Sequence, residues 1–574
     1  MALDANGNVY ITGDIIDTNY SATAGALSNP NGKVFVAKLN ASGSSLSYAA
    51  RFGSTGVDDV SAIAVDGSGD TYVAGWSYAS DYPATPGAFT TPQTGAFVTE
   101  LNDTGSAFVY SARLGGSDRY PIGGLGTRPL AIAVDDAHEA FVTGATDSKL
   151  FPVTPTAFQS KLAGGADAFL LRLNGSGSAV IYATYLGGGS GAYGTDALEA
   201  ANAIAVDQNG NAYLTGTARS STHPFPVTAG AFQKIYVPNS SFFAFAARIN
   251  TNSSGATSLV YSTLLGGRGL GGNAIKIDAT GNAYVAGGTY DLVFPTTPTA
   301  FQSCRSGPAA NGDLFVTVIG PSGNHLLFST LFGGANGDGP SAVALDSGNN
   351  LYVAGTTSST NFPVTTGTFQ AAYGGGNWDG FIAKFNRAAF TTLSPKVVVC
   401  TPANGATVTN GFQVAGTLQS GYQARWVAVY VDGVNTFQES GMNTVEPHIT
   451  ESAGTHQVMI KGQNAAGSLF SSTVTIKINS NPKPGISSIT PSSAVAGGPA
   501  FTLSLQGLRF VPASVVQWNG SPRSTRFIQN NLGGYLQASI LASDIAHSGT
   551  AQVTVVNPAP GGGVSNAVTF TISP

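Results

Sequence analysis

A ten-residue segment recurs six times in the first two-thirds of this chain and constrains its fold more than any other feature. Each copy begins with aspartate and ends with glycine, and the closing glycines lie 62 to 72 residues apart. A repeat of this regularity indicates an array of similar units that bury their apolar faces against one another. The six copies are Asp4–Gly13, Asp66–Gly75, Asp135–Gly144, Asp207–Gly216, Asp278–Gly287 and Asp346–Gly355.

Each copy belongs to a longer unit with four strand-like segments, of which the aspartate-to-glycine segment is the second. In the third unit the other segments are LAIAVD (130–135), AFLLRL (168–173) and VIYATYLG (180–187). Short runs rich in Val, Ile, Tyr and Phe are typical of strands, and D-x-x-G-N and N-x-S-G-S are typical of tight turns. We therefore expect an all-β fold, a β-propeller with six visible four-stranded repeats.

Composition excludes several classes of protein. The chain has 574 residues, of which 42% are hydrophobic and only 10% charged, with a formal net charge of −5 and no basic stripe. This balance argues against nucleic acid as a partner. No run of 18 or more apolar residues occurs, so we expect no membrane span. A surface of Ser, Thr and Asn suits an extracellular or cell-surface protein, although no signal peptide is visible because Met1 leads directly into the repeat.

The repeat resembles a known family. The motifs D-x-x-G-N-x-Y-V-x-G, F-P-V-T-x-G-A-F-Q, D-A-F-x-x-(K/R)-L-N and Y-x-T-x-L-G-G follow one another in fixed order, and Asp167–Asn174 and Tyr182–Gly188 match closely. In this combination, residues 1–386 resemble the bacterial seven-bladed β-propeller repeat, SBBP. The resemblance implies seven blades. The sixth copy lacks a clear fourth strand after Phe385, so either that strand and a seventh blade lie upstream of Met1, or Ala388–Leu393 forms a short outer strand.

The remaining third of the chain predicts two further domains, which divides the chain into residues 1–392, 393–480 and 481–574. About seven short strands over residues 393–480 suggest an immunoglobulin-like sandwich of the kind found in bacterial surface proteins. Residues 481–574 resemble the IPT/TIG domain, through I-x-P-S-S-x-x-A-G-G and V-x-N-P-x-P-G-G-G-x-S-N. Cys304 and Cys400 are the only cysteines, and they could form a disulfide or remain separate.

No motif for catalysis, metal or cofactor binding emerges. The six histidines show no metal-ligand spacing, and neither a nucleophile elbow nor a phosphate-binding loop occurs. The aspartate of D-x-x-G-N could be part of a calcium loop. An aspartate that accepts backbone N–H bonds within its own turn is the simpler interpretation. We therefore expect no cofactor, no metal and no catalytic residue.

The alternation of short turns and long loops predicts where binding would occur. The long loops between second and third strands, and the connections between repeats, share one face of the array, and they hold most of the sequence variation. Variable loops on a rigid scaffold are common binding surfaces. Candidate residues on this face are Trp76, Tyr78, Arg119, Tyr120, Arg128, Tyr193 and Trp378, together with the carboxylates Asp58, Asp196 and Asp338.

Two functions from different classes follow from these features. The first is a non-enzymatic extracellular or cell-surface protein, whose loop face binds a glycan or a protein and whose Ig-like modules act as a stalk or as adhesion units. The alternative is a polysaccharide lyase or glycosidase. That enzyme would need two of the loop-face carboxylates held about 5–10 Å apart in a pocket. The oligomeric state is left open.

Overall fold

The computed structural model describes the chain apart from residues 17–19, 92–94, 116–125, 190–198, 220–223, 237–241, 308–310, 391–393, 410 and 529–533. The chain divides into two compact units, Met1–Thr392 and Leu393–Pro574. Its described residues form strands and three short 3-10 turns, which confirms the expected all-β class. No helix among them is long and apolar enough to cross a membrane.

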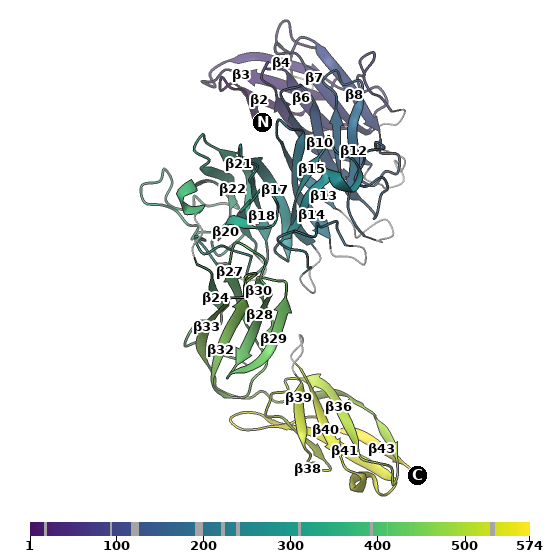
Figure 1. Ribbon diagram of the computed structural model, residues 1–574, viewed down its shortest axis with the longest axis vertical. Coiled ribbons are helices and arrows are strands. Elements are labelled where there is room, and N and C mark those ends of the chain that lie inside the picture. The colour runs from purple at the N-terminus through teal and green to yellow at the C-terminus, as the bar shows by residue number, and fades with distance from the viewer. Residues whose placement is uncertain are drawn as a thin grey trace. The chain divides into compact units, whose positions relative to one another are not determined.

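The first unit contains six antiparallel sheets, one for each copy of the repeat (Figure 1). Five sheets have four strands in sequence order, and the sixth has three. Each sheet packs against the next one along the chain. Sheet one has β1 (Ala2–Leu3), β2 (Val9–Asp14), β3 (Val34–Leu39) and β4 (Leu46–Phe52); sheet two has β5 (Asp58–Val65), β6 (Thr71–Ser77), β7 (Gly95–Leu101) and β8 (Phe108–Gly115).

The other four sheets repeat this order. Sheet three has β9 (Thr127–Val134), β10 (Ala140–Thr146), β11 (Asp167–Leu173) and β12 (Val180–Leu186). Sheet four has β13 (Ala200–Val206), β14 (Asn211–Arg219), β15 (Phe242–Asn250) and β16 (Leu259–Leu265), with the 3-10 turn η1 (Gly255–Ser258) before β16. Sheet five has β17 (Gly269–Ile277), β18 (Ala283–Thr289), β19 (Asp313–Ile319) and β20 (Leu326–Phe332), and sheet six has β21 (Asp338–Leu345), β22 (Leu351–Thr357) and β23 (Asp379–Phe385).

Equivalent residues occupy equivalent places in these sheets because the second and third strands keep one register. Tyr10 lies opposite Lys38 in sheet one, and Tyr72 lies opposite Glu100 in sheet two. The third strands β11 and β19 are buried along their whole length. Strands covered on both sides contain continuous apolar runs instead of alternating ones, as at 168–171 in β11 and 314–316 in β19.

A close backbone approach explains the glycine that closes five of the six copies of the repeat, Gly13 being the exception. A Cβ atom added at Gly216 would lie 1.9 Å from the carbonyl oxygen of Ala200 on the first strand of its sheet. At Gly144 the same distance, to the carbonyl oxygen of Arg128, is also 1.9 Å. The register of the first strand shifts at this point, as at a β-bulge. Glycine is therefore the residue that lets the first strand pack against the second.

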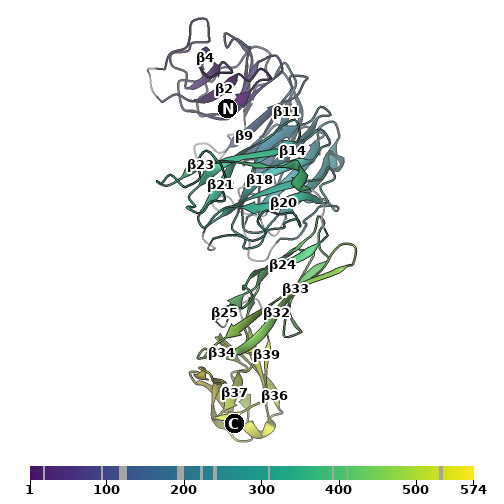
Figure 2. The same cartoon turned by 90° about the vertical axis from the view of Figure 1, so that its left-hand side faces the viewer.

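Within the described part of the chain, sheet six ends at the edge strand β23 (Figure 2). The alternative expectation, that Ala388–Leu393 forms an outer strand, is wrong for its described part, because Arg387–Phe390 form the 3-10 turn η2. Phe390 is 8% exposed, and its ring packs 4.6 Å from that of Phe328 in sheet five. Burial of this ring explains why the chain turns away from β23. As a result, Ile382 on β23 is 81% exposed.

The F-P-x-T-x-G-A-F-Q motif holds the long loop against the fourth strand through hydrogen bonds. In sheet five, Thr297 and Ser329 of β20 exchange bonds, with each backbone N–H donating at 3.0 Å, to Ser329 O and to Thr297 Oγ1. The backbone N–H of Gln302 donates to Thr330 Oγ1 at 3.0 Å. Sheet six has the same motif at Phe362–Gln370, but its described residues include no fourth strand for the loop to pack against.

Neither Cys304 nor Cys400 is a free thiol.

The second unit contains two groups of strands, each with its own apolar core. The first group has β24 (Lys396–Thr401), β25 (Thr407–Val408), β26 (Phe412–Gln413), β27 (Ala415–Gln419), β28 (Trp426–Val431), β29 (Val434–Ser440), β30 (Thr444–Val445), β31 (His448–Ile449), β32 (Gly454–Gln463) and β33 (Leu469–Ile478). The second group has β34 (Gly485–Thr490), β35 (Ser493–Val495), β36 (Phe501–Leu508), β37 (Val515–Trp518), β38 (Ser521–Pro522), β39 (Thr525–Ile528), β40 (Tyr535–Ile540), the turn η3 (Ala542–Ile545), β41 (Gly549–Asn557), β42 (Gly563–Val564) and β43 (Val568–Ser573).

Candidate functional site

The two ends of each repeat sheet differ in character. Because neighbouring strands are antiparallel, the two short turns of a sheet lie at one end, here named the turn end. In sheet one a Cβ added at Gly7 in the first turn would lie 3.4 Å from the Cβ of Ala41 in the second. The long loop between second and third strands lies at the opposite end, named the loop end. Functional side chains are therefore sought at each end separately.

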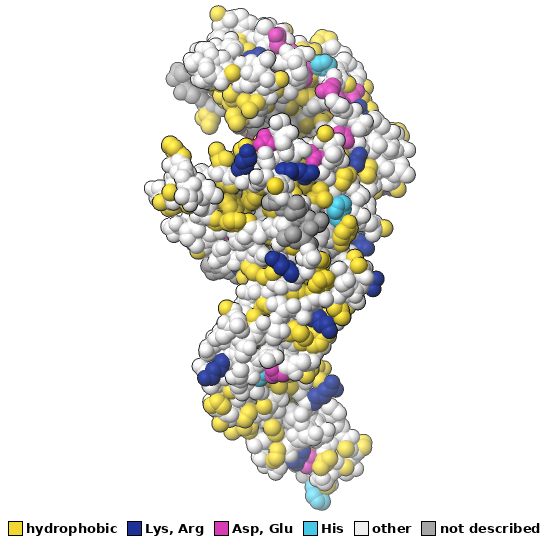
Figure 3. Space-filling model, turned by 60° about the vertical axis from the view of Figure 1, so that its left-hand side comes forward, with side chains coloured by type: hydrophobic (Ala, Val, Ile, Leu, Met, Phe, Trp, Pro, Cys, Tyr) yellow, Lys and Arg dark blue, Asp and Glu magenta, His cyan; other side chains and the backbone are white. Residues whose placement is uncertain are grey.

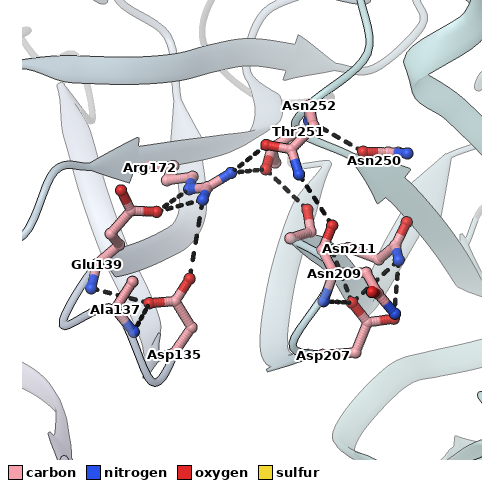
Figure 4. Close-up of polar contacts among 11 residues, drawn as sticks. Asp135, Ala137, Glu139, Arg172, Asp207, Asn209, Asn211, Asn250, Thr251 and Asn252 are labelled. Carbon is pink, nitrogen blue, oxygen red and sulfur yellow. Dashed lines mark hydrogen bonds and ion pairs between the residues drawn. The ribbon is translucent and has the colours of Figure 1, made fainter.

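An aspartate organises the turn end of every sheet. In sheet four the backbone N–H groups of Asn209 and Asn211 donate to Asp207 Oδ1 at 2.9 and 3.0 Å (Figure 4). The hydroxyl of Tyr213 donates to Asp207 Oδ2 at 3.3 Å. A side chain that bonds its own backbone two and four residues further on stiffens the turn. The hydrogen bonds that the simpler interpretation of D-x-x-G-N expects are therefore present in this turn.

In three of the six sheets a basic side chain on the third strand lies within 4 Å of this aspartate. In sheet three Arg172 donates from Nε to Glu139 Oε2 at 2.6 Å and from Nη1 to Thr251 Oγ1 at 2.7 Å, which links it to sheet four (Figure 4). In sheet six Lys384 Nζ lies 3.3 Å from Asp346 Oδ2. Sheet five has an apolar residue instead. The basic residues at this position of the third strand are Lys38, Arg172, Arg248 and Lys384.

Sheet two departs from this arrangement because it has Glu100 at the position of the basic residue. Glu100 is 2% exposed. One ligand oxygen from each of Asp66, Asp70 and Glu100 lies within 4.8 Å of the others. Burial, together with the nearby carboxylates, raises the pKa of Glu100 to about 7. Among the residues that the structure describes, this is the one group of three side chains close enough to hold a metal ion.

A histidine from the next sheet completes this acidic group. His138 Nδ1 lies 2.6 Å from Asp66 Oδ2, and this hydrogen bond raises the pKa of His138. His138 has a φ of 61°, at the turn position where most other copies have glycine. The sequence signal was an acidic residue in AFVTEL where VFVAKL and AFLLRL have a basic one. Sequence reasoning missed this signal because it compared the copies for their common residues.

Aromatic side chains gather at the loop end of sheets two and three. The rings of Trp76 and Tyr78 meet edge to face with centroids 4.0 Å apart. The guanidinium carbon of Arg128, on the first strand of sheet three, lies 4.6 Å from the Trp76 ring centroid. Tyr78 is 37% exposed. The structure thus brings three of the predicted loop-face residues together, in a group that can offer both an apolar ring surface and N–H donors.

The predicted loop-face carboxylates Asp58 and Asp338 are buried, at 4% and 3% exposure. Asp58 accepts hydrogen bonds of 2.6 Å from the backbone N–H and the hydroxyl of Ser54. Asp338 accepts a hydrogen bond of 2.7 Å from the N–H of Gly334, and burial raises the pKa of Asp338. Both therefore stabilise the turn that follows a fourth strand.

Glu199 has the same place before sheet four. Its carboxylate accepts a hydrogen bond of 2.6 Å from the N–H of Gly188, and the residue is 2% exposed. Burial is the main reason that its pKa is raised to about 8, and the charge of Asp167 adds to the effect. Burial also raises the pKa of Asp167 to about 6. Asp58, Glu199 and Asp338 therefore bind backbone N–H groups within the sheets and are not accessible to a ligand in solution.

The other predicted residues are more scattered. Trp378, just before β23, is 56% exposed. Arg119, Tyr120, Tyr193 and Asp196 lie outside the described residues. On the face shown in Figure 3, charged side chains are few compared with uncharged ones.

Comparison with known proteins yields one family match. The Beta-propeller repeat family, SBBP, matches residues 327–363, which run from β20 through β22 into the loop beyond. The chain is thus an all-β protein with many four-stranded antiparallel sheets, one stretch of which has the sequence of a β-propeller repeat. A search of curated proteins found no match.

Solved structures show only weak similarity. The fibronectin(III)-like modules of Clostridium thermocellum CbhA share 12% identity, with 31% of this chain and 94% of that chain covered and a TM-score of 0.14. Bacteroides ovatus SGBP-B, in complex with a mixed-linkage heptasaccharide, shares 14% identity over 31% and 48%, with a TM-score of 0.14. A 1.5-MDa bacterial ice-binding adhesin shares 14% over 51% and 91%, with a TM-score of 0.13. TM-scores this low carry no argument about function.

Proposed function

We propose that this chain is a non-enzymatic extracellular or cell-surface protein that binds a glycan at the loop end of sheets two and three. In this proposal the six repeat sheets belong to a β-propeller, six- or seven-bladed. The second unit then contains a bacterial Ig-like domain, residues 393–480, and an IPT/TIG domain, residues 481–574, which act as a stalk or as adhesion units.

The observation that carries the proposal is the group of Trp76, Tyr78 and Arg128. Sugar rings present C–H faces that pack on aromatic rings, while their hydroxyls need hydrogen-bond partners. The edge-to-face contact between the two rings and the guanidinium over Trp76 hold this surface in one arrangement. A rigid surface loses little conformational entropy on binding, which favours affinity.

The alternative function, a polysaccharide lyase or glycosidase, has less support. Hydrolysis needs two accessible carboxylates on either side of the scissile bond. Asp58 and Asp338 are buried and engaged with backbone N–H groups, so both belong to the framework of the repeat. No other loop-face carboxylate of the prediction lies within the described residues.

The test combines a glycan array with calorimetry on the full chain and on Trp76→Ala. We expect saturable binding of at least one glycan class, and a loss of about tenfold or more in affinity in Trp76→Ala, because aromatic anchors commonly dominate binding energy. The matched control is Tyr422→Ala, an aromatic residue of the second unit that is 52% exposed. Equal loss in both variants, or binding only to proteins, would contradict the proposal. Release of reducing ends from any polysaccharide would support the enzyme instead.

A further inference from the structure

We propose that Asp66, Asp70, Glu100 and His138 form a binding site for a divalent cation at the turn end, between sheets two and three. The site rests on a departure from the repeat. Four of the other sheets have Lys or Arg where sheet two has Glu100, and the neighbouring turn position, usually Asn, is Asp70 here. Two substitutions in one sheet therefore replace a cation and an amide with two carboxylates.

The geometry suits a shared ion. The three carboxylate groups each place an oxygen within 4.8 Å of the others, close enough for one cation to contact all of them. Glu100 is 98% buried, and its Oε2 atom has no hydrogen-bond partner among the described residues. A buried carboxylate oxygen without a partner costs free energy, and a bound cation removes that cost.

The charges around the group leave it strongly negative. On its own sheet, Tyr72 donates a hydrogen bond to Asp66 Oδ2 at 3.1 Å and brings no charge. On the sheet-one side, Lys38 Nζ lies 3.7 Å from the Cβ that Gly69 would have, close to Asp103. On the sheet-three side the imidazole of His138 is the group that contacts Asp66. Lys38 and Asp103 thus lie beside Gly69 in the same turn with opposite charges, while the three carboxylates of the group itself face one imidazole. No other turn end among the described residues brings three such side chains together.

The donor set indicates the class of cation. Carboxylates suit Mg²⁺, Ca²⁺ and Mn²⁺, whereas imidazole suits Zn²⁺ and other first-row transition metals. A site with three carboxylates and one imidazole fits Mn²⁺ or Zn²⁺ better than Ca²⁺, which prefers six to eight oxygen ligands. His138 is about half exposed at its side chain, 45%, whereas Asp66 is 3% exposed, so the imidazole side is the open one. Its ring can turn from Asp66 toward an ion that enters there.

The test uses the full chain after chelation, titrated with MnCl₂ and followed by the electron paramagnetic resonance signal of free Mn²⁺. We expect one saturable site per chain and a rise in melting temperature with Mn²⁺ or Zn²⁺. In Glu100→Lys the affinity should fall about tenfold or more, since the change removes a ligand and adds a like charge. This variant should fold, because Lys384 has the same place in sheet six.

Two further variants keep the result interpretable. Glu100→Gln removes the charge with little change of shape and should also weaken Mn²⁺ binding. Asp136 is an exposed acid in the same turn as His138, and its carboxylate accepts a hydrogen bond from Gln208 instead of facing the proposed site. Asp136→Asn should therefore bind Mn²⁺ as tightly as the unaltered chain does. Absence of saturable binding of both Mn²⁺ and Zn²⁺ would overturn the proposal. So would equal affinity in Glu100→Lys and the unaltered chain.

Discussion

Replacing Glu199 by glutamine should remove a pH dependence of stability that the buried acid creates. Glu199 is 2% exposed, and its pKa is raised from 4.5 to about 8. An acid whose pKa is raised by folding holds its proton more tightly in the folded state. The free energy of unfolding is therefore highest at low pH, falls as pH rises from about 4.5 to about 8, and is constant above that range.

The expected size follows from this pKa. Each pH unit across the window costs about 1.4 kcal/mol for one such group. Between pH 6 and pH 8, allowing for half-titration at the upper end, Glu199 alone should lower the free energy of unfolding by about 2 kcal/mol. For a unit the size of Met1–Thr392, this corresponds to a decrease in melting temperature of roughly 2–3 °C.

The assay is differential scanning calorimetry of both proteins at pH 6 and pH 8. Between pH 6 and pH 8 the melting temperature of Glu199→Gln should fall by roughly 2–3 °C less than that of the unaltered chain. A suitable control is Asp81→Asn, since Asp81 is exposed and its hydrogen bond from Thr55 lowers its pKa. The control should keep the decrease of the unaltered chain. If Glu199→Gln also keeps it, Glu199 is ionised in the folded protein and the reasoning is wrong.

Two other predictions concern the repeat itself. Gly216→Ala should destabilise the first unit by about 1–3 kcal/mol in denaturant unfolding, because its Cβ would lie 1.9 Å from Ala200 O. Gly230→Ala, with nothing within 4 Å, should change stability by less than about 0.5 kcal/mol, and equal effects would refute the close approach. A labelled peptide with the sequence of Val180–Gly188 should bind the edge strand β23, measured by fluorescence anisotropy against a scrambled peptide. Equal anisotropy changes with both peptides would contradict it.

Much of the fold was predictable because its signals are local. Short apolar runs and turn residues act over a few neighbours, so the strand bounds of β3 were predicted directly from VFVAKL. The hydrogen bonds of the turn aspartate were also predictable, since its partners lie two and four residues away. The absence of a fourth strand after Phe385 could be seen in the same way. Its replacement by a 3-10 turn could not, because the burial of Phe390 depends on a ring in sheet five.

The sites required tertiary structure, for a physical reason that their residues illustrate. The sequence by itself determined the repeat, its strands and the division into turn and loop ends, because those follow from short-range pattern. Only packing between sheets decided that Arg128 covers Trp76, that Asp58 is buried, and that His138 reaches Asp66, 72 residues earlier in the chain. Charge, burial and contact across sheets depend on distance in space. The repeated residues predict the strands and turns of each sheet. Only the structure shows that residues departing from the repeat, such as Glu100 and His138, lie close together across neighbouring sheets.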